Sequence, residues 1–202
     1  MIHYNSFYLN FIYLIYKVLL CYNIFLNIFI RIFMSKIGIL VASSNNNQKL
    51  ALKIKELAIS QNCEVELINL VDLRLPLYST VEEEENGIPE SVLDFATKIL
   101  ALKAFIIVAP EYNGVMPPVL NNAMAWTSRA TKNWRDAFNE KIVGLATHSG
   151  GGGAKGLQAM RIMFQHLGAT IIAREILTTY EKPLNDESAI SMINSLVKLS
   201  KA

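Results

Sequence analysis

The chain has 202 residues, of which 52% are hydrophobic and 18% are charged. This composition suits one globular domain with a sizeable core and excludes an intrinsically disordered chain. The formal net charge is only +2, and no stripe of Lys and Arg is interleaved with aromatic residues, which argues against nucleic-acid binding. Two cysteines, Cys21 and Cys63, are too few for a disulfide framework or a ligand cluster, so we expect buried thiols in a reducing compartment and no metal site.

The first 33 residues differ in composition from the rest of the chain. They are rich in Ile, Phe, Tyr, Leu and Asn, and they hold Lys17 and Arg31 but no acidic residue. Their longest uncharged run is shorter than the roughly 20 residues of a spanning helix, and no signal-peptide cleavage site is visible. Three interpretations remain: upstream sequence read as protein before a true start at Met34, a weak membrane anchor, or a helix packed on the domain. We expect the functional domain to be residues 34–202, with membrane contact only if 1–33 belong to the protein.

From residue 36 onward, short apolar runs typical of buried strands alternate with amphipathic helical patterns. The expected strands are 36–42, 63–70, 105–110, 141–149 and 170–177. The expected helices are 48–60, 91–104, 117–131, 154–169 and 185–202. Segment 71–90, which contains four consecutive Glu, is expected to be a solvated connection. The alternation predicts an α/β fold of the flavodoxin-like, doubly wound kind: a five-stranded parallel sheet in the order 2-1-3-4-5 with helices on both faces.

The first of three unusual loops follows the first strand and leads into a helix. It reads Ser43-Ser44-Asn45-Asn46-Asn47, and no Lys or Arg occurs before Lys49. Hydroxyls, amides and free backbone N–H groups at a helix N-terminus suit a phosphate monoester. The alternative is that these polar residues only cap the helix.

The second loop, Pro110 to Pro118, follows the third strand. Gly114 permits backbone conformations that are closed to other residues, and the two prolines stiffen the exit. Tyr112 offers a flat ring and the backbone around it offers donors and acceptors to a planar heterocycle. The alternative is an ordinary turn between strand and helix.

The third loop, Thr147 to Gly153, follows the fourth strand and ends in four glycines. Four are more than a turn requires and give a ligand close access to the backbone; a flexible hinge is the alternative. Ligands of doubly wound sheets bind beyond the carboxyl ends of the strands at the switch point, where these three loops should meet. Together they predict a planar ligand with a phosphate tail, which is the shape of flavin mononucleotide (FMN).

The stretches "GILVASSNNN", "APEYNGVMPPVLNNAMAW" and "ATHSGGGGAKGLQAMRIMFQHLG" resemble the NAD(P)H-dependent FMN reductase family, which includes flavodoxin-like quinone, chromate and azo-dye reductases. The resemblance covers about residues 35–180. Many members have a longer first loop that contains an Arg, which this chain lacks. The resemblance implies that the first loop holds the phosphate and that the second and third surround the ring. The cofactor-binding residues that it implies are Ser43, Ser44, Asn45, Asn47, Pro110, Glu111, Tyr112, Asn113, Gly114, His148, Ser149, Gly150 and Gly151.

The activity implied is hydride transfer from NADPH or NADH through FMN to a small electron acceptor: a quinone, a free flavin, an azo compound or a metal oxyanion. One space serving donor and acceptor in turn predicts ping-pong kinetics, and no side chain is needed as acid or base. His148 could donate a proton, orient the loop or only pack. The alternatives are a flavodoxin-like electron carrier, whose strongly acidic surface the neutral segment 34–202 lacks, and a flavin-binding regulatory module.

We also expect a cytoplasmic protein that forms a homodimer or homotetramer, because the family usually dimerises. Five large residues could either contact a second subunit or belong to the core. They are Trp126, Trp134, Met160, Met163 and Phe164.

Overall fold

The computed structural model describes residues 13, 15–20, 22 and 35–201. The chain divides into two units, Met1–Met34 and Ser35–Ala202. The few described residues of the first unit are helical and exposed, and the predictions for 1–33 otherwise lie outside the described residues. Among the helices of the described part of the chain, none is long and apolar enough to cross a membrane.

The second unit is built on a parallel sheet, which confirms the predicted fold class. Its strands are β1 (Ser35–Val41), β2 (Cys63–Asn69), β3 (Ala104–Val108), β4 (Ile142–His148), β5 (Thr170–Ile171) and β6 (Ile176–Thr178). They follow the order β2-β1-β3-β4-β5, and β6 pairs with β4 beyond the end of β5. Every pairing is parallel, as crossover connections through helices require.

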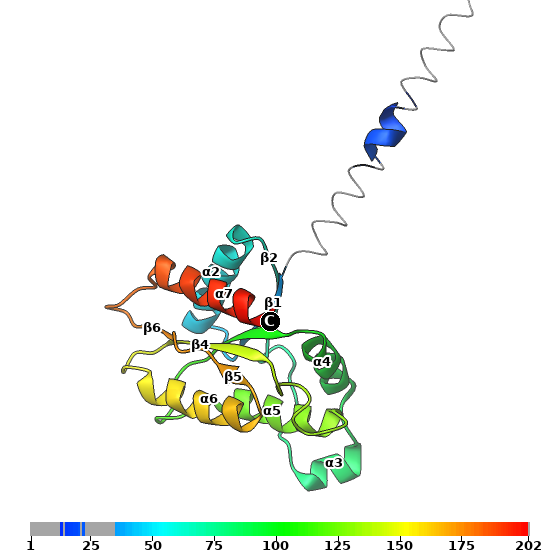
Figure 1. The fold of residues 1–202 in the computed structure, drawn as a ribbon. Coiled ribbons are helices and arrows are strands. Elements are labelled where there is room, and N and C mark those ends of the chain that lie inside the picture. Colours follow the sequence, from blue (N-terminus) through cyan, green and yellow to red (C-terminus); the bar gives the residue numbers. More distant parts are fainter. Residues whose placement is uncertain (1–12, 14, 21, 23–34, 202) are drawn as a thin grey trace, which may run out of the picture. The chain divides into compact units, whose positions relative to one another are not determined.

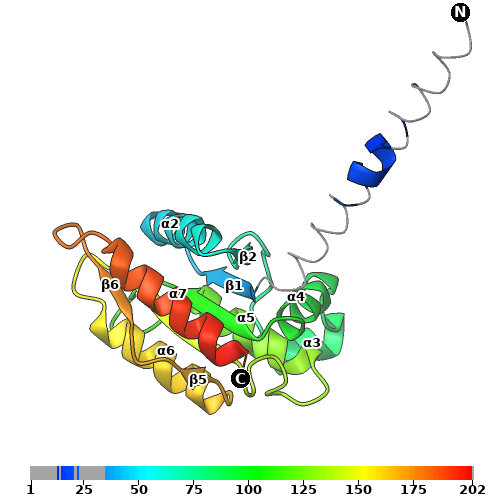
Figure 2. The same cartoon turned by 45° about the horizontal axis from the view of Figure 1, so that its top comes forward.

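Helices cover both faces of this sheet. They are α2 (Asn46–Ser60), α3 (Thr80–Asn86), α4 (Glu90–Leu100), α5 (Pro118–Ala130), α6 (Ala154–His166) and α7 (Asp186–Ser200). Helices α2 and α7 lie on one face, and α4, α5 and α6 lie on the other (Figures 1 and 2). This is the doubly wound arrangement that the alternating pattern predicts.

The central strand β3 shows why the apolar runs are continuous. All five of its residues are fully buried, because both faces of the strand are covered by helices. Phe105 and Ile107 pack into the core beneath α4, α5 and α6, whereas Ile106 and Val108 pack into the core beneath α2 and α7. The two cores together fix the sheet in place and hold its carboxyl edge rigid.

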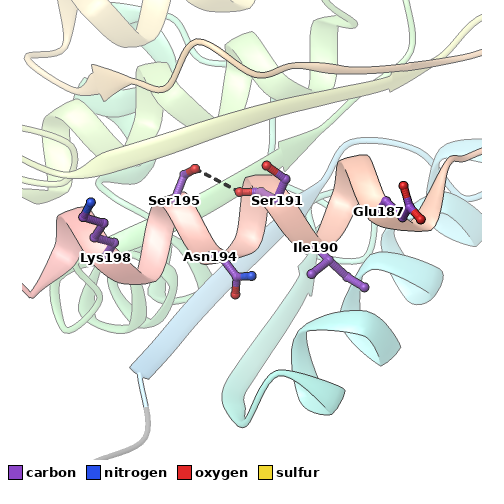
Figure 3. A pocket seen from close by; sticks show the side chains of 6 residues that line it. All are labelled: Glu187, Ile190, Ser191, Asn194, Ser195 and Lys198. Carbon is purple, nitrogen blue, oxygen red and sulfur yellow. Dashed lines mark hydrogen bonds between the residues drawn. The ribbon is translucent and has the colours of Figure 1, made fainter.

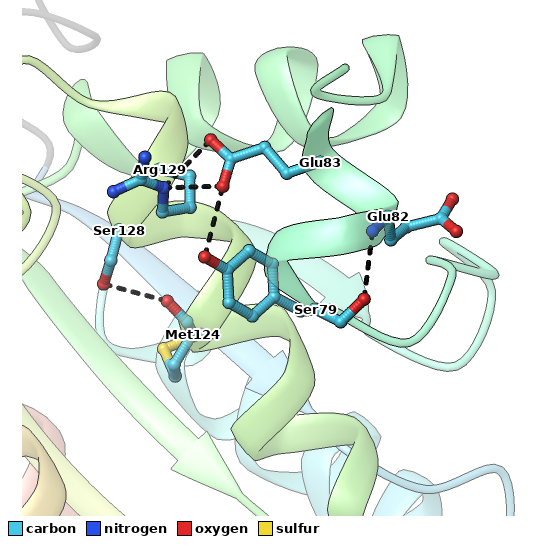
Figure 4. Close-up of polar contacts among 7 residues, drawn as sticks. Ser79, Glu82, Glu83, Met124, Ser128 and Arg129 are labelled. Atoms are coloured by element: carbon cyan, nitrogen blue, oxygen red, sulfur yellow. Dashed lines mark hydrogen bonds and ion pairs between the residues drawn. The ribbon is translucent and has the colours of Figure 1, made fainter. Parts of the chain in front are cut away.

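The predicted solvated connection 71–90 was wrong in part, because it contains helix α3. Ser79 caps this helix by accepting a hydrogen bond from the Glu82 backbone N–H at 3.0 Å (Figure 4). Glu82 and Glu83 lie in the first turn, where acidic side chains interact favourably with the helix dipole. A run of like charges therefore forms a helix here because its N-terminal end is capped and two of its four Glu side chains lie in the first turn.

The predicted last strand, 170–177, is interrupted. Its two halves pair with opposite ends of β4, β5 at Ile142 and Val143 and β6 at Ala146 to His148. In the gap, Arg161 of α6 donates to the Glu175 carboxylate at 2.6 Å and to the Ile172 carbonyl at 3.3 Å. These contacts tie the intervening backbone to α6, and β6 still ends at the edge of the sheet where β4 ends.

Three of the five large residues named above belong to the core. Trp126, Met160 and Phe164 are fully buried, and Met163 is partly buried against the same core. Trp134 is 45% exposed and stacks on His166 with 5.2 Å between ring centroids. The core interpretation therefore holds for the buried three.

Candidate functional site

The register of the sheet brings the three predicted loops together. Val41, Val108 and Ala146 lie level in adjacent strands, so the loops that follow them start side by side. A cavity of about 170 Å³ opens at this carboxyl edge. Its predicted lining residues are Ser43, Asn45, Asn47, Pro110, Glu111, Tyr112, His148, Ser149 and Gly150. Four others, Ser44, Asn113, Gly114 and Gly151, stand outside this lining.

Asn47 ties the first loop to the third. Its side-chain amide donates to the His148 carbonyl at 2.9 Å, and its side-chain oxygen accepts from the His148 N–H at 2.7 Å. The side chain is almost fully buried, with 3% of the residue exposed. Both polar groups of the Asn47 side chain are therefore engaged in holding the first and third loops at a fixed separation.

The N-terminus of α2 lacks a cap of its own. The N-cap residue Asn45 makes no side-chain capping bond and no acidic residue stands in the first turn. Within the described part of the chain, the backbone N–H groups of Asn46 and Asn47 have no acceptor. Unmatched donors and the positive end of a helix dipole make this an anion-binding position.

The N-terminus of α6 already has a carboxylate beside it. The Glu111 carboxylate accepts a hydrogen bond from the Gly156 backbone N–H at 2.8 Å. A Cβ on Gly156 would lie 3.0 Å from the Glu111 Cβ, so any larger residue would press on Glu111 and glycine suits this close approach. Glu111 thereby anchors the second loop to the helix that follows the third loop. Each of the two helix ends near the cavity leaves its first two backbone N–H groups without an acceptor among the described residues, Ala154 and Lys155 in the case of α6. Only α6 already has a carboxylate beside it, so α2 is the end more open to an anion.

The second loop presents Tyr112 on a tight turn. The N–H and carbonyl of Tyr112 exchange hydrogen bonds with Val115 at 2.9 and 3.0 Å. Asn113 and Gly114 occupy the two central positions with φ of 54° and 78°. Positive φ at both positions is typical of a type I′ turn, for which Asn-Gly is the preferred pair. Tyr112 is left 49% exposed at the rim of the cavity.

The third loop is shaped by Ser149 and Gly153. Ser149 is buried; its N–H donates to the Thr178 carbonyl at 3.0 Å, and its hydroxyl accepts from the Gly151 N–H at 3.3 Å. Gly153 has φ of 80°, and a Cβ there would lie 2.8 Å from the Thr147 methyl carbon. Gly151 has open space around it. Gly152 also has a positive φ, of 126°. The glycine run therefore combines two positions that require glycine with others that keep the backbone accessible.

The hydrogen bonds of His148 determine its tautomer. The Thr178 hydroxyl donates its only hydrogen to the Thr147 carbonyl at 3.1 Å. Its oxygen lies 3.1 Å from His148 Nδ1, so Nδ1 must carry the hydrogen of that contact. In the neutral ring, Nε2 is then an acceptor. It is buried without a partner among the described residues.

A neighbouring hollow of about 310 Å³ shares Asn46, His148 and Tyr180 with this cavity and belongs to the same edge of the sheet. A hollow elsewhere on the domain lacks this convergence of loops. The hollow over α7 is formed by side chains of that one helix, from Glu187 to Lys198, and Ser195 donates to the Ser191 carbonyl of the same helix at 2.9 Å (Figure 3). Within residues 35–201, no group of three or more His, Cys, Asp or Glu side chains could hold a metal ion. The carboxyl edge of the sheet is therefore the candidate site.

Comparison with known proteins agrees with this geometry. The family profile described as NADPH-dependent FMN reductase matches residues 35–181. The chain belongs to this family. A 2-hydroxy-1,4-benzoquinone reductase of Burkholderia is 37% identical over 98 residues, which are 46% of this chain and 50% of that protein. A probable NADPH:quinone oxidoreductase of rice is 33% identical over 97 residues, 47% of this chain and 46% of that one. The alignments thus span about half the length of these two relatives.

Other relatives match over most of their length. An uncharacterized protein of Mycoplasma pneumoniae is 26% identical over 79% of this chain and 96% of its own. Among solved structures, the NAD(P)H:acceptor oxidoreductase FerB of Paracoccus denitrificans superposes with a TM-score of 0.68 and 20% identity over 83% of this chain and 98% of its own. An archaeal flavodoxin superposes with a TM-score of 0.59 and 14% identity over 84% of this chain and all of its own. These similarities confirm the flavodoxin-like fold.

The residues of this FMN reductase family member fit an FMN cofactor. The open N-terminus of α2 suits the phosphate, and the accessible backbone of the third loop suits a close-lying ring. The buried Nε2 of His148 lacks a donor, and leaving such an acceptor without one costs about 1–3 kcal/mol. A hydroxyl-bearing ligand at this edge would supply the missing donor.

The sequence reasoning did not single out two residues that the structure brings to the cavity. Asn46 and Tyr180 both line it. Asn46 lay within the Asn run already noted. Tyr180 follows β6, whose carboxyl end lies at the same edge as that of β4. The last strand of the predicted sheet could have directed attention to it.

Proposed function

We propose that the protein is an FMN-dependent NAD(P)H oxidoreductase that passes hydride to a small acceptor, a quinone, a free flavin, an azo compound or a metal oxyanion. The observation that carries this proposal is the meeting of three loops at one cavity, whose lining includes an open helix N-terminus and an exposed aromatic turn. Membership of the FMN reductase family makes FMN the ligand for such a cavity.

The proposed placement of the cofactor follows the unmatched groups. The backbone N–H groups of Asn46 and Asn47, with the hydroxyls of Ser43 and Ser44, would hold the phosphate. Tyr112 and the backbone from Ser149 to Gly151 would border the ring. The cavity of about 170 Å³ is smaller than the roughly 300–1,000 Å³ typical of ligand pockets. We therefore expect the ring to rest partly on the open rim beside Tyr112, where a second planar molecule can reach it.

The protein's own part is to bind, orient and expose the ring. Bound FMN supplies the hydride chemistry. Asn47 and Glu111 fix the spacing of the loops by the hydrogen bonds described above. His148, with its hydrogen held on Nδ1 by Thr178, offers an acceptor to a cofactor hydroxyl. This arrangement favours an orienting role for His148 over proton donation.

The open rim supports ping-pong kinetics. Donor and acceptor would each have to lie on the same exposed ring face, so the first must leave before the second binds. The rival function, an electron carrier that docks on protein partners, gains no support from charge, because residues 34–202 hold equal numbers of acidic and basic side chains. A regulatory module would bind flavin without steady turnover.

The test is the visible absorption spectrum of the purified chain, recorded without oxygen before and after NADPH. Oxidised-flavin bands that bleach with NADPH and return on adding a quinone support the enzyme. Bands that do not bleach favour the carrier or the module. No flavin binding, even after FMN is added, contradicts the proposed site. The ping-pong scheme would be supported by parallel lines in double-reciprocal plots of initial rate against NADPH concentration, measured at several fixed quinone concentrations.

We propose further that residues 34–202 are the functional domain of a cytoplasmic homodimer or homotetramer. The mass of the protein isolated from its own cells would show whether translation starts at Met34. Sedimentation of the same sample would give the oligomeric state, and a species at monomer mass would contradict that part of the proposal.

A further inference from the structure

Tyr180 occupies an unusual position for a large aromatic residue. It lies in the loop between β6 and α7, with 78% of the residue exposed. Its ring nevertheless packs edge-to-face on His148, with 5.1 Å between centroids and 83° between planes. Its hydroxyl accepts a hydrogen bond from the Asn46 side-chain amide at 3.1 Å. Tyr180 thus contacts both the first loop and the third loop.

The Tyr180 hydroxyl has a hydrogen to give. A phenol can accept and donate, and here the oxygen accepts from Asn46. Among the described residues no acceptor takes its own hydrogen. The side chain lines the cavity together with Ser43 and Asn45. An O–H donor therefore stands at the rim of the position where the α2 N-terminus offers its unmatched N–H groups.

A phosphate at this position needs such a donor. The first loop contains no Lys or Arg from Ser43 to Gln48, so this loop itself offers only neutral N–H and O–H groups to the charge. Lys49 is not among the residues that line the cavity, although it lines the neighbouring hollow together with Tyr180. Asn47 is already engaged by His148. A phosphate monoester has three terminal oxygens, and each can accept more than one hydrogen bond. The backbone N–H groups of the first turn of α2 are too few to satisfy all of these oxygens.

We propose that Tyr180 is a phosphate-binding residue of the cofactor site: its hydroxyl accepts from Asn46 and donates to the phosphate of FMN. The proposal deepens the proposed function and rests on it. The contact makes the protein select FMN over riboflavin, which has the same ring and ribityl chain but no phosphate. Asn46 then orients the Tyr180 hydroxyl, and the packing of the Tyr180 ring on His148 holds the loop between β6 and α7 in position.

The test compares two ligands on the full-length chain. The dissociation constants of FMN and riboflavin are measured by quenching of flavin fluorescence for the wild type and for Tyr180→Phe. We expect Tyr180→Phe to raise the FMN dissociation constant about tenfold or more, as loss of a hydrogen bond to a charged group does. We expect the riboflavin constant to stay unchanged, because the ring of residue 180 is kept.

Two further variants and one spectroscopic readout complete the test. Tyr78→Phe, which removes a hydroxyl bonded to Glu83 on α3, should change neither constant. The ³¹P resonance of bound FMN should shift in Tyr180→Phe and not in Tyr78→Phe. Lys49→Ala tests the nearest lysine of the first turn.

Three results would overturn the proposal. One is an unchanged FMN constant in Tyr180→Phe while the wild type binds FMN; the proposed function then survives and the tyrosine contact does not. Another is an equal loss for FMN and riboflavin, which would assign Tyr180 to packing. The third is a loss of FMN affinity in Lys49→Ala alone, which would assign the phosphate contact to the ammonium. Failure of the wild type to bind FMN at all would overturn both the inference and the proposed function.

Discussion

Two polar clusters of this protein differ in how completely their hydrogen bonds are satisfied. In the cluster between α3 and α5, Tyr78 donates to Glu83 at 3.1 Å. Arg129 donates to both oxygens of the same carboxylate at 3.0 and 2.9 Å (Figure 4). Trp126 donates to the Pro76 carbonyl at 2.8 Å. Burial raises the pKa of Tyr78, with help from the hydrogen bond and charge of Glu83, and the same carboxylate raises the pKa of Arg129. The named groups are all partnered.

At the carboxyl edge of the sheet, groups are left open. Three buried side-chain atoms of the described residues lack a partner, and two of them, His148 Nε2 and Thr147 Oγ1, belong to the strand that ends at the cavity. The third, Ser35 Oγ, lies at the start of β1. The α2 N-terminus and the Tyr180 hydroxyl add open donors. The difference teaches that a closed network serves the fold, whereas an open one is prepared for a ligand.

The largest effect should come from breaking the closed cluster. Trp126→Ala removes a fully buried side chain that packs edge-to-face on Tyr78 with 5.0 Å between ring centroids. We expect a loss of about 3–5 kcal/mol in the free energy of unfolding, typical of a buried Trp replaced by Ala. Urea denaturation measures it. The control Trp134→Ala, at a 45% exposed site, should cost far less, and equal losses would contradict the assignment of Trp126 to the core.

The second effect tests the link between two loops of the site. Glu111→Ala frees the second loop from the Gly156 N–H. We expect the FMN dissociation constant to rise about tenfold, because both loops loosen and the binding of FMN must then order them. Glu111→Gln keeps an acceptor oxygen and should restore most of the affinity. If Gln is as poor as Ala, the negative charge rather than the loop anchor would be the important property.

A smaller effect separates two glycines of the same run. Gly153→Ala places a side chain at φ of 80° and 2.8 Å from the Thr147 methyl carbon. We expect a loss of at least about 1–2 kcal/mol, the usual cost of the left-handed conformation for a residue with a Cβ. Gly151→Ala meets nothing within 4 Å and should stay within about 0.5 kcal/mol of the wild type. Thermal unfolding of both variants is the measurement.

The smallest effect should come from a substitution that caps the open N-terminus of α2. Asn45→Asp puts a carboxylate at the N-cap of α2, where no side chain now caps the helix. We expect the protein without cofactor to gain about 0.3–1 kcal/mol of stability from the helix dipole. FMN should bind more weakly, because the carboxylate repels the phosphate. If Asn45→Asp raised both the unfolding free energy and the FMN affinity, or lowered both, the result would contradict the idea that this helix end is kept open for an anion.

Much of the fold could be predicted because its signals are local. Continuous apolar runs such as Phe105 to Ala109 occur where both faces of a strand are buried, and helical patterns between them impose parallel pairing. The predictions failed at two places where a specific hydrogen bond, rather than the pattern of residue types, decided the local structure. The Glu run became α3 because Ser79 caps it. The last strand broke where Arg161 holds Ile172 and Glu175.

The sequence by itself determined the sheet order, the edge at which the three loops meet and the residue types available there. Only the tertiary structure decided which of those residues are free to bind. Asn47 and Glu111 are engaged in joining loops. The α6 end has the Glu111 carboxylate beside it whereas the α2 end has none, and the Tyr180 hydroxyl comes from a distant loop. The reason is that periodicity reports which face of an element is buried, whereas hydrogen-bond satisfaction depends on partners far apart in the chain.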